Sequence, residues 1–214
     1  MKFQIDFDIL KGLNVLSAKK DIRYYMNGVF IEITPKGAYF VATDGHKMGI
    51  WHESEITAPE TIQHVIPATL IDQVSKAINK TINLVDIDLG PMIEINNLNN
   101  VFKAPAIDGK YPDFRRVIPE TISNEIAQFD PEFLSQFYKC AAILNSVKKP
   151  DIAIGHNGTG SGSIVDIQNG KFLGVIMPYK SKADFSSYKK PLWVDYAPAP
   201  AAVIEAPAPE LEAA

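Results

Sequence analysis

The chain has 214 residues, of which 46% are hydrophobic and 21% charged, an ordinary globular composition that is enough for one large domain or two small ones. It contains no apolar run of the roughly eighteen residues that a membrane-spanning helix needs, and Asp6 interrupts the start where a signal peptide would be continuously apolar. Cys140 is the only cysteine, which excludes an intrachain disulfide and favours a reducing, cytoplasmic location.

The net charge of −4 comes from the C-terminal end of the chain. Residues 191–214 hold Asp195, Glu205, Glu210 and Glu212 and neither Lys nor Arg, so residues 1–190 are neutral overall. The acidic balance therefore does not exclude a nucleic-acid partner, because the position of the positive charge matters more than its sum. From residue 197 the sequence is mostly Ala, Pro and Glu, and we expect a mobile tail there.

The body is predicted to be an α+β protein in which one βαβββ unit occurs three times. Each unit opens with a short strand and continues into an amphipathic helix and three further strands. The predicted helices are about Asp8–Ala18, about Pro67–Asn79, and a third that begins at Pro131 after the N-cap Asp130. The predicted strands are Lys2–Asp6, Gly28–Thr34, Tyr39–Thr43 and Lys47–His52 in the first unit, Gln63–Ile66, Leu84–Leu89, Met92–Asn96 and Val101–Ala106 in the second, and Glu125–Phe129, Asp151–Gly155, Ser163–Gln168 and Lys171–Met177 in the third.

Beyond their first turns, the predicted helices and their ends carry lysine and no acid. For any single helix, a solvated face is the simpler interpretation. Three such helices together would form a basic surface that attracts phosphates without reading sequence. These residues are Lys11, Lys19, Lys20, Lys76, Lys80, Lys139, Lys148 and Lys149.

Four stretches, in the same order, resemble the bacterial DNA polymerase III beta subunit (beta sliding clamp) family. They are Asp21–Gly28 (DIRYYMNG), Val41–Met48 (VATDGHKM), Gly109–Pro119 (GKYPDFRRVIP) and Val175–Pro178 (VIMP). The resemblance covers residues 1 to about 180 and implies a DNA clamp fold, in which helices line a ring channel and sheets form the outside.

The resemblance also implies a domain division. Residues 1–115 would form one complete clamp domain of two units, residues 116–182 half a clamp domain of one unit, and residues 183–214 a C-terminal extension. The family has three domains per chain, so the matching part corresponds to one and a half of them.

In the family, partner proteins insert a short peptide with apolar side chains into a hydrophobic cleft. The residues that match this cleft are Met26, Thr43, Gly45, His46, Lys47, Met48, Pro112, Arg116, Val117, Val175, Met177 and Pro178. Methionines would make an adaptable apolar floor, and the charges of Lys47 and Arg116 would hold peptide carbonyls or an acidic flank. Met48, Val117 and Val175 would equally suit an ordinary core. Arg23 and Tyr24, with Lys20, match a family segment near the DNA path.

The implied function is that of a sliding clamp, a non-enzymatic processivity factor that encircles duplex DNA without a cofactor. Its partners would be double-stranded DNA, a DNA polymerase and other proteins that carry a clamp-binding peptide, a clamp loader, and further copies of itself. Twelve units make the family ring, so three units per chain predict a tetramer. A head-to-tail trimer would follow instead if residues 120–195 formed a compressed full domain.

Two alternatives remain open at this point. The chain would act as a regulator or decoy of a full-length clamp if it kept the cleft but formed no ring. A small hydrolase could use Asp44 and His46, although a turn that closes a hairpin explains Asp44-Gly45-His46 better. The glycine-rich segment 155–163 lacks the Lys-Ser/Thr of a phosphate loop, and the four histidines show no metal-ligand spacing.

Overall fold

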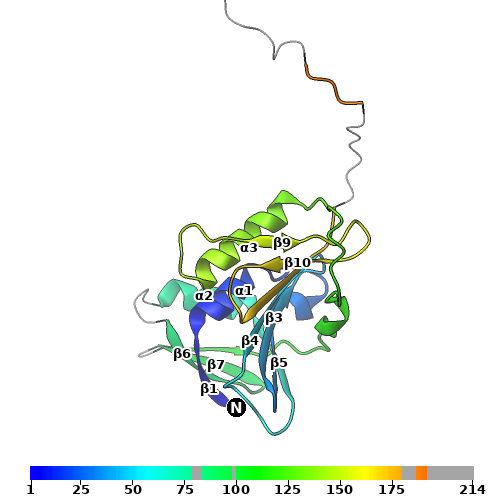
Figure 1. Ribbon diagram of the computed structural model, residues 1–214. Helices are drawn as coiled ribbons and strands as arrows, with labels where there is room; N and C mark the ends of the chain where they lie inside the picture. Colours follow the sequence, from blue (N-terminus) through cyan, green and yellow to red (C-terminus); the bar gives the residue numbers. More distant parts are fainter. Residues whose placement is uncertain (79–82, 98–99, 180–186, 192–214) are drawn as a thin grey trace, which may run out of the picture. The chain divides into compact units, whose positions relative to one another are not determined.

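The computed structural model describes residues 1–78, 83–97, 100–179 and 187–191 (Figure 1). Two compact units are present, Met1–Lys180 and Ser181–Ala214, and the fold and site described below lie within the first. Lys80 and most of the predicted 183–214 extension, including the tail from 197, lie outside the described residues.

Three α-helices form from the amphipathic segments, each close to its predicted start. They are α1 (Phe7–Asn14), α2 (Ala68–Ala77) and α3 (Pro131–Leu144). The side chain of Asp6 accepts a hydrogen bond from the backbone N–H of Asp8, and the side chain of Asp130 accepts one from that of Glu132. An acid that precedes the helix therefore caps α1 and α3. In Figure 1 α1 lies between α2 and α3.

The strands form two antiparallel sheets. The four-stranded sheet has the order β1 (Lys2–Asp6), β6 (Leu84–Asp88), β7 (Met92–Asn97) and β8 (Asn100–Pro105). The seven-stranded sheet has the order β5 (Ile62–Pro67), β2 (Gly28–Thr34), β3 (Gly37–Thr43), β4 (Lys47–Glu53), β11 (Phe172–Ile176), β10 (Ser163–Asp166) and β9 (Ala153–Gly155). The glycine-rich segment 156–162 is the loop of the hairpin formed by β9 and β10.

The predicted opening strand of the third unit, Glu125–Phe129, is wrong. Only one isolated bridge forms in it, between Gln128 and Tyr179. Asn124 adopts a positive φ of 63°, and the segment after it bonds to the loop that follows β9 rather than to a strand edge. The third unit is therefore αβββ among the described residues, and β9 ends the seven-stranded sheet.

One antiparallel pairing joins the third unit to the first. β11 pairs with β4 in a register that sets Val175 opposite Met48 and Gly174 opposite Gly49. Because side chains alternate across a strand, Met48 and Val175 point to one face of the sheet while their neighbours point to the other. The helices cover the second face, and segment 107–118 packs on the first.

At positions 49 and 174, on the helix side of this seam, there is room only for glycine. A Cβ at Gly49 would lie 2.5 Å from Cδ1 of Leu16, and a Cβ at Gly174 would lie 2.8 Å from Phe137 of α3. The paired glycines therefore let the helix layer approach the sheet where the two units join.

We expect Gly174→Ala to lower the free energy of unfolding by about 1–3 kcal/mol, because the new methyl overpacks a closed core. Gly170→Ala is the matched control, since nothing lies within 4 Å of a Cβ at that position. Urea titration of both variants measures the difference. Equal midpoints for the two variants would contradict the close approach at the seam.

Candidate peptide-binding pocket

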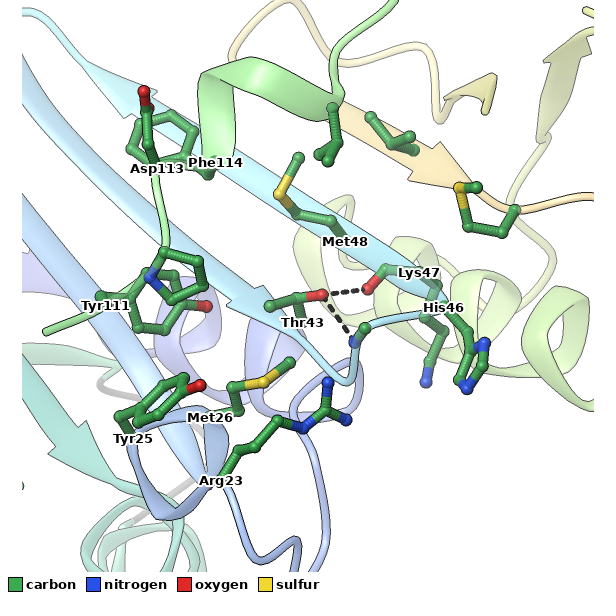
Figure 2. Close-up of a pocket in the computed structure, with 15 residues that line it drawn as sticks. Arg23, Tyr25, Met26, Thr43, His46, Lys47, Met48, Tyr111, Asp113 and Phe114 are labelled. Carbon is green, nitrogen blue, oxygen red and sulfur yellow. Dashed lines mark hydrogen bonds between the residues drawn. The ribbon is translucent and has the colours of Figure 1, made fainter. Parts of the chain in front are cut away.

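A pocket of about 280 Å³ opens on the sheet face opposite the helices, where β4 meets β11 (Figure 2). Its walls come from four segments: the 3₁₀ turn Tyr24–Met26 with the residue before it, the β3–β4 turn, segment 111–117, and the end of β11 with Met177 after it. The lining residues are Arg23, Tyr25, Met26, Thr43, Gly45, His46, Lys47, Met48, Tyr111, Pro112, Asp113, Phe114, Val117, Val175 and Met177.

The apolar surface of the pocket follows from strand alternation. Met48 and Val175, opposite one another across the β4–β11 seam, both point away from the helices and are nearly buried. Met26 is also buried, whereas Val117 and Met177 are 52% and 40% exposed. The pocket thus combines a buried apolar floor with an exposed apolar rim, and its methionines can adapt to different side chains.

Aromatic contacts and an ion pair hold segment 111–117, which forms one wall of the pocket. The ring of Tyr111 stacks on Phe30 of β2 with centroids 4.3 Å apart, and Phe114 meets the same ring edge-on. Arg115 forms an ion pair with the buried Glu32 and lies 4.3 Å from the centroid of the Phe114 ring. These contacts fix segment 111–117 on the sheet.

The β3–β4 turn is a closed hydrogen-bonded structure. The carboxylate of Asp44 accepts hydrogen bonds from the backbone N–H groups of His46 and Lys47, and Thr43 Oγ1 accepts one from Gly45. Gly45 has a φ of 94°, which favours glycine. The pair Asp44 and His46 therefore builds a hairpin turn, and the carboxylate proposed for a hydrolase is already used by this turn.

The ammonium of Lys47 lies on the helix side of the sheet. Its side chain is 2% exposed, is paired with Asp44, and places Nζ 4.9 Å from the centroid of the Phe133 ring of α3. The predicted role of this charge at a bound peptide is wrong, because alternation along β4 turns residues 47 and 48 to opposite faces. The ring of His46 also stacks on Phe133, with centroids 5.8 Å apart.

The structure brings most of the predicted cleft residues together and leaves two out. Arg116 and Pro178 do not line the pocket; Arg116 is exposed beside Arg115, the arginine that pairs with Glu32. The remaining ten do line it: Met26, Thr43, Gly45, His46, Lys47, Met48, Pro112, Val117, Val175 and Met177. Four further lining residues have no predicted role, although all four lie within the matching motifs: Tyr25, Tyr111, Asp113 and Phe114.

Arg23 was predicted to face DNA, yet it lines this pocket. Its guanidinium donates to both carboxylate oxygens of Asp21 and to the carbonyl of Asp44. These hydrogen bonds to Arg23 lower the pKa of Asp21 to about 2. Tyr24, beside it, is 57% exposed and meets Tyr25 edge-on.

The predicted DNA-binding lysines are distributed over the helix layer. Lys76 and Lys139 are exposed on α2 and α3, and Lys11 lies on α1 with Nζ 3.6 Å from Asp8. Lys19 donates to the carbonyl of Asn14. The remaining described members, Lys20, Lys148 and Lys149, are exposed near helix ends.

Other chemistry finds little support in the described part of the chain. No group of three or more His, Cys, Asp or Glu that could hold a metal ion occurs among these residues. Burial raises the pKa of the Cys140 thiol, which disfavours its reactive thiolate form. None of the described helices is both long and apolar enough to cross a membrane.

The Asp44–Lys47 pair gives a pH prediction. Burial alone would raise the pKa of Asp44, but hydrogen bonds from the Lys47 ammonium and the turn amides outweigh burial and lower the pKa. The stabilisation is therefore complete at neutral pH and is lost as the pH falls through this lowered pKa.

We expect Asp44→Asn to cost about 3 kcal/mol at pH 7, since it leaves the Lys47 ammonium buried without its partner. The difference in free energy of unfolding between the variant and the wild type should become smaller below about pH 4. Urea unfolding across pH 2–7 tests this, with the exposed Glu120→Gln as control. A gap that stays constant over the whole range would exclude the ion pair as its cause.

Comparison with known proteins places this fold. The family of the DNA polymerase III beta subunit, central domain, matches residues 8–113. A beta sliding clamp of Buchnera aphidicola subsp. Acyrthosiphon pisum is 33% identical over 159 residues, which is 69% of this chain and 41% of that protein. The beta sliding clamp of Vibrio cholerae is 32% identical over 61% of this chain and 36% of its own length.

Solved structures agree on the fold. The DNA polymerase III subunit beta from Pseudomonas aeruginosa superposes with a TM-score of 0.68 at 19% identity, covering 85% of this chain and 67% of that one. A putative DNA polymerase III beta subunit from Eubacterium rectale gives a TM-score of 0.69 at 13% identity, covering 85% and 66%. The chain spans about two fifths of the length of the curated relatives it matches. The chain belongs to the bacterial DNA polymerase III beta subunit family.

Proposed function

We propose that this protein is a DNA sliding clamp, a non-enzymatic processivity factor that encircles duplex DNA and tethers replication or repair proteins in the cytoplasm. The observation that carries the proposal is the pocket at the β4–β11 seam, on a fold shared with DNA polymerase III beta subunits. A pocket with a buried floor and an exposed apolar rim suits a short peptide that inserts apolar side chains. DNA polymerase, other proteins with such a peptide, and a clamp loader are the proposed partners.

The helix layer is the proposed DNA surface. Its exposed lysines, Lys76 and Lys139 among them, sit on different helices and would meet phosphates rather than base edges. Attraction of this kind is indifferent to sequence and weakens with salt. Retention on DNA would then depend on the closed ring and not on the strength of any one contact.

Threading onto DNA tests the ring. The protein is mixed with a linear duplex, the ends are blocked with streptavidin, and salt is raised. We expect retention on blocked DNA and loss from open DNA, because only a ring is trapped by blocked ends. Lys76→Glu with Lys139→Glu should reduce loading several-fold, whereas Lys36→Glu, in the β2–β3 turn, should not. Equal release from blocked and open DNA would favour the regulator or decoy.

The free sheet edges support a tetramer. β4 is already paired with β11, so its edge is not free for a contact between chains. β8 lies at one free edge of the four-stranded sheet, and Val101 on this strand is 57% exposed. An exposed strand edge is a liability unless another strand covers it.

Two isologous contacts would close the ring. β8 would pair with β8 of one neighbour, and the third unit, with its free β9 edge, would pair with the third unit of the other. Four chains then supply twelve units. A trimer requires a compressed full domain in residues 120–195, yet residues 120–179 hold only α3 and β9–β11.

Light scattering decides the assembly. We expect four times the chain mass of 23.6 kDa for the wild type. Val101→Lys should halve that mass, because it adds like charge beside Lys103 at the paired edge. Leu84→Lys, on a strand two places from that edge, is the matched control and should remain tetrameric. A wild-type mass of one, two or three chains would contradict the proposal.

A further inference from the structure

Most polar groups that line the pocket already form hydrogen bonds or ion pairs within the protein. The hydroxyl of Thr43 donates to the carbonyl of Lys47 and accepts from the amide of Gly45. The charges of Arg23 and Lys47 are paired with Asp21 and Asp44. The carboxylate of Asp113 accepts from the amide of Arg115, which caps the 3₁₀ turn Phe114–Val117.

Tyr111 differs from these residues. Its side chain is 8% exposed, and its hydroxyl has no hydrogen-bond partner among the described residues. Figure 2 shows the hydroxyl oxygen turned towards Thr43 and Met26, into the pocket. Burial raises the pKa of this hydroxyl, so it stays protonated and can act as a donor.

The hydroxyl does not help to hold the wall in place. Tyr111 is fixed by its ring, which stacks on Phe30 at an interplanar angle of 3°, and phenylalanine would stack equally well. A buried hydroxyl without a partner costs stability, because it has lost water and gained nothing in return. An acceptor that arrives with a ligand would recover this cost.

We propose that the hydroxyl of Tyr111 is the polar anchor of the pocket and donates a hydrogen bond to a backbone carbonyl of the inserted peptide. This inference rests on the proposed peptide-binding function and adds a specificity determinant to it. Met26 and Met48 cover the floor beside Tyr111, and their flexible side chains shift to expose the hydroxyl as the peptide enters. An apolar pocket with one such donor favours a peptide that presents a carbonyl next to its apolar side chains over a purely apolar ligand.

The test uses the full-length protein and a fluorescein-labelled pentapeptide that ends in Leu-Phe, with affinity read from anisotropy. Tyr111→Phe keeps the stacked ring and removes only the hydroxyl. We expect it to weaken peptide affinity about tenfold and, without peptide, to raise the melting temperature by about 2–4 °C. Tyr138→Phe, at an exposed position on α3, should change neither value.

A second arm locates the acceptor. Replacing the Leu–Phe amide of the probe by an ester weakens the acceptor strength of its carbonyl. The wild type should lose affinity for this ester, whereas Tyr111→Phe should bind both probes about equally. Unchanged affinity of Tyr111→Phe for the amide probe, while Met177→Lys abolishes binding, would overturn the role of Tyr111 and leave the pocket standing. Failure of the wild type to bind any probe, or binding that Met177→Lys leaves intact, would overturn the peptide pocket itself.

Discussion

The antiparallel pairing of β4 with β11 is the contact on which the rest of the structure depends. It joins residues 121 to 129 positions apart in sequence and merges strands of the first and third units into one sheet. On one face it sets Met48 beside Val175 and so creates the pocket floor. On the other face it sets Gly49 beside Gly174 and so admits the helix layer. One register thus fixes both surfaces, because a slip of one residue would exchange the two faces.

The β3–β4 turn connects these surfaces. Its residues Thr43 and Gly45 line the pocket, while Lys47 and the ring of His46 contact Phe133 of α3. The turn is rigid because Asp44 satisfies its amides. The same hairpin therefore contacts the pocket on one side and α3, a helix of the layer proposed to face DNA, on the other.

The sequence predicted the features that depend on local physics. The start of α3 follows from Asp130, whose side chain caps the amide two residues further on, and the strands follow from alternation and breakers. Local patterns failed where tertiary contacts decide. Glu125–Phe129 has strand-like composition but finds no strand edge, because its backbone bonds to the loop after β9. Alternation along β4 predicts that Lys47 and Met48 point to opposite faces of the sheet. The family motif contains both residues, and the resemblance therefore assigned both to the cleft.

Tertiary contacts also decide which further residues line the pocket. Tyr25, Tyr111 and Phe114 lie within the same motifs as the predicted cleft residues Met26 and Pro112. Stacking on Phe30, on a distant strand, decides which way the Tyr111 ring faces, and a single sequence does not reveal that partner.

The proposed assembly would change what the pocket can do. Isologous contacts relate neighbours by two-fold axes, so four chains closed by two kinds of such contact alternate in orientation. Each face of the ring would then carry two pockets, whereas head-to-tail closure puts every pocket on one face. A partner bound through its peptide could engage the ring from either side of the DNA path. Directionality would have to come from the partner or from the DNA junction, since the ring itself has two equivalent faces.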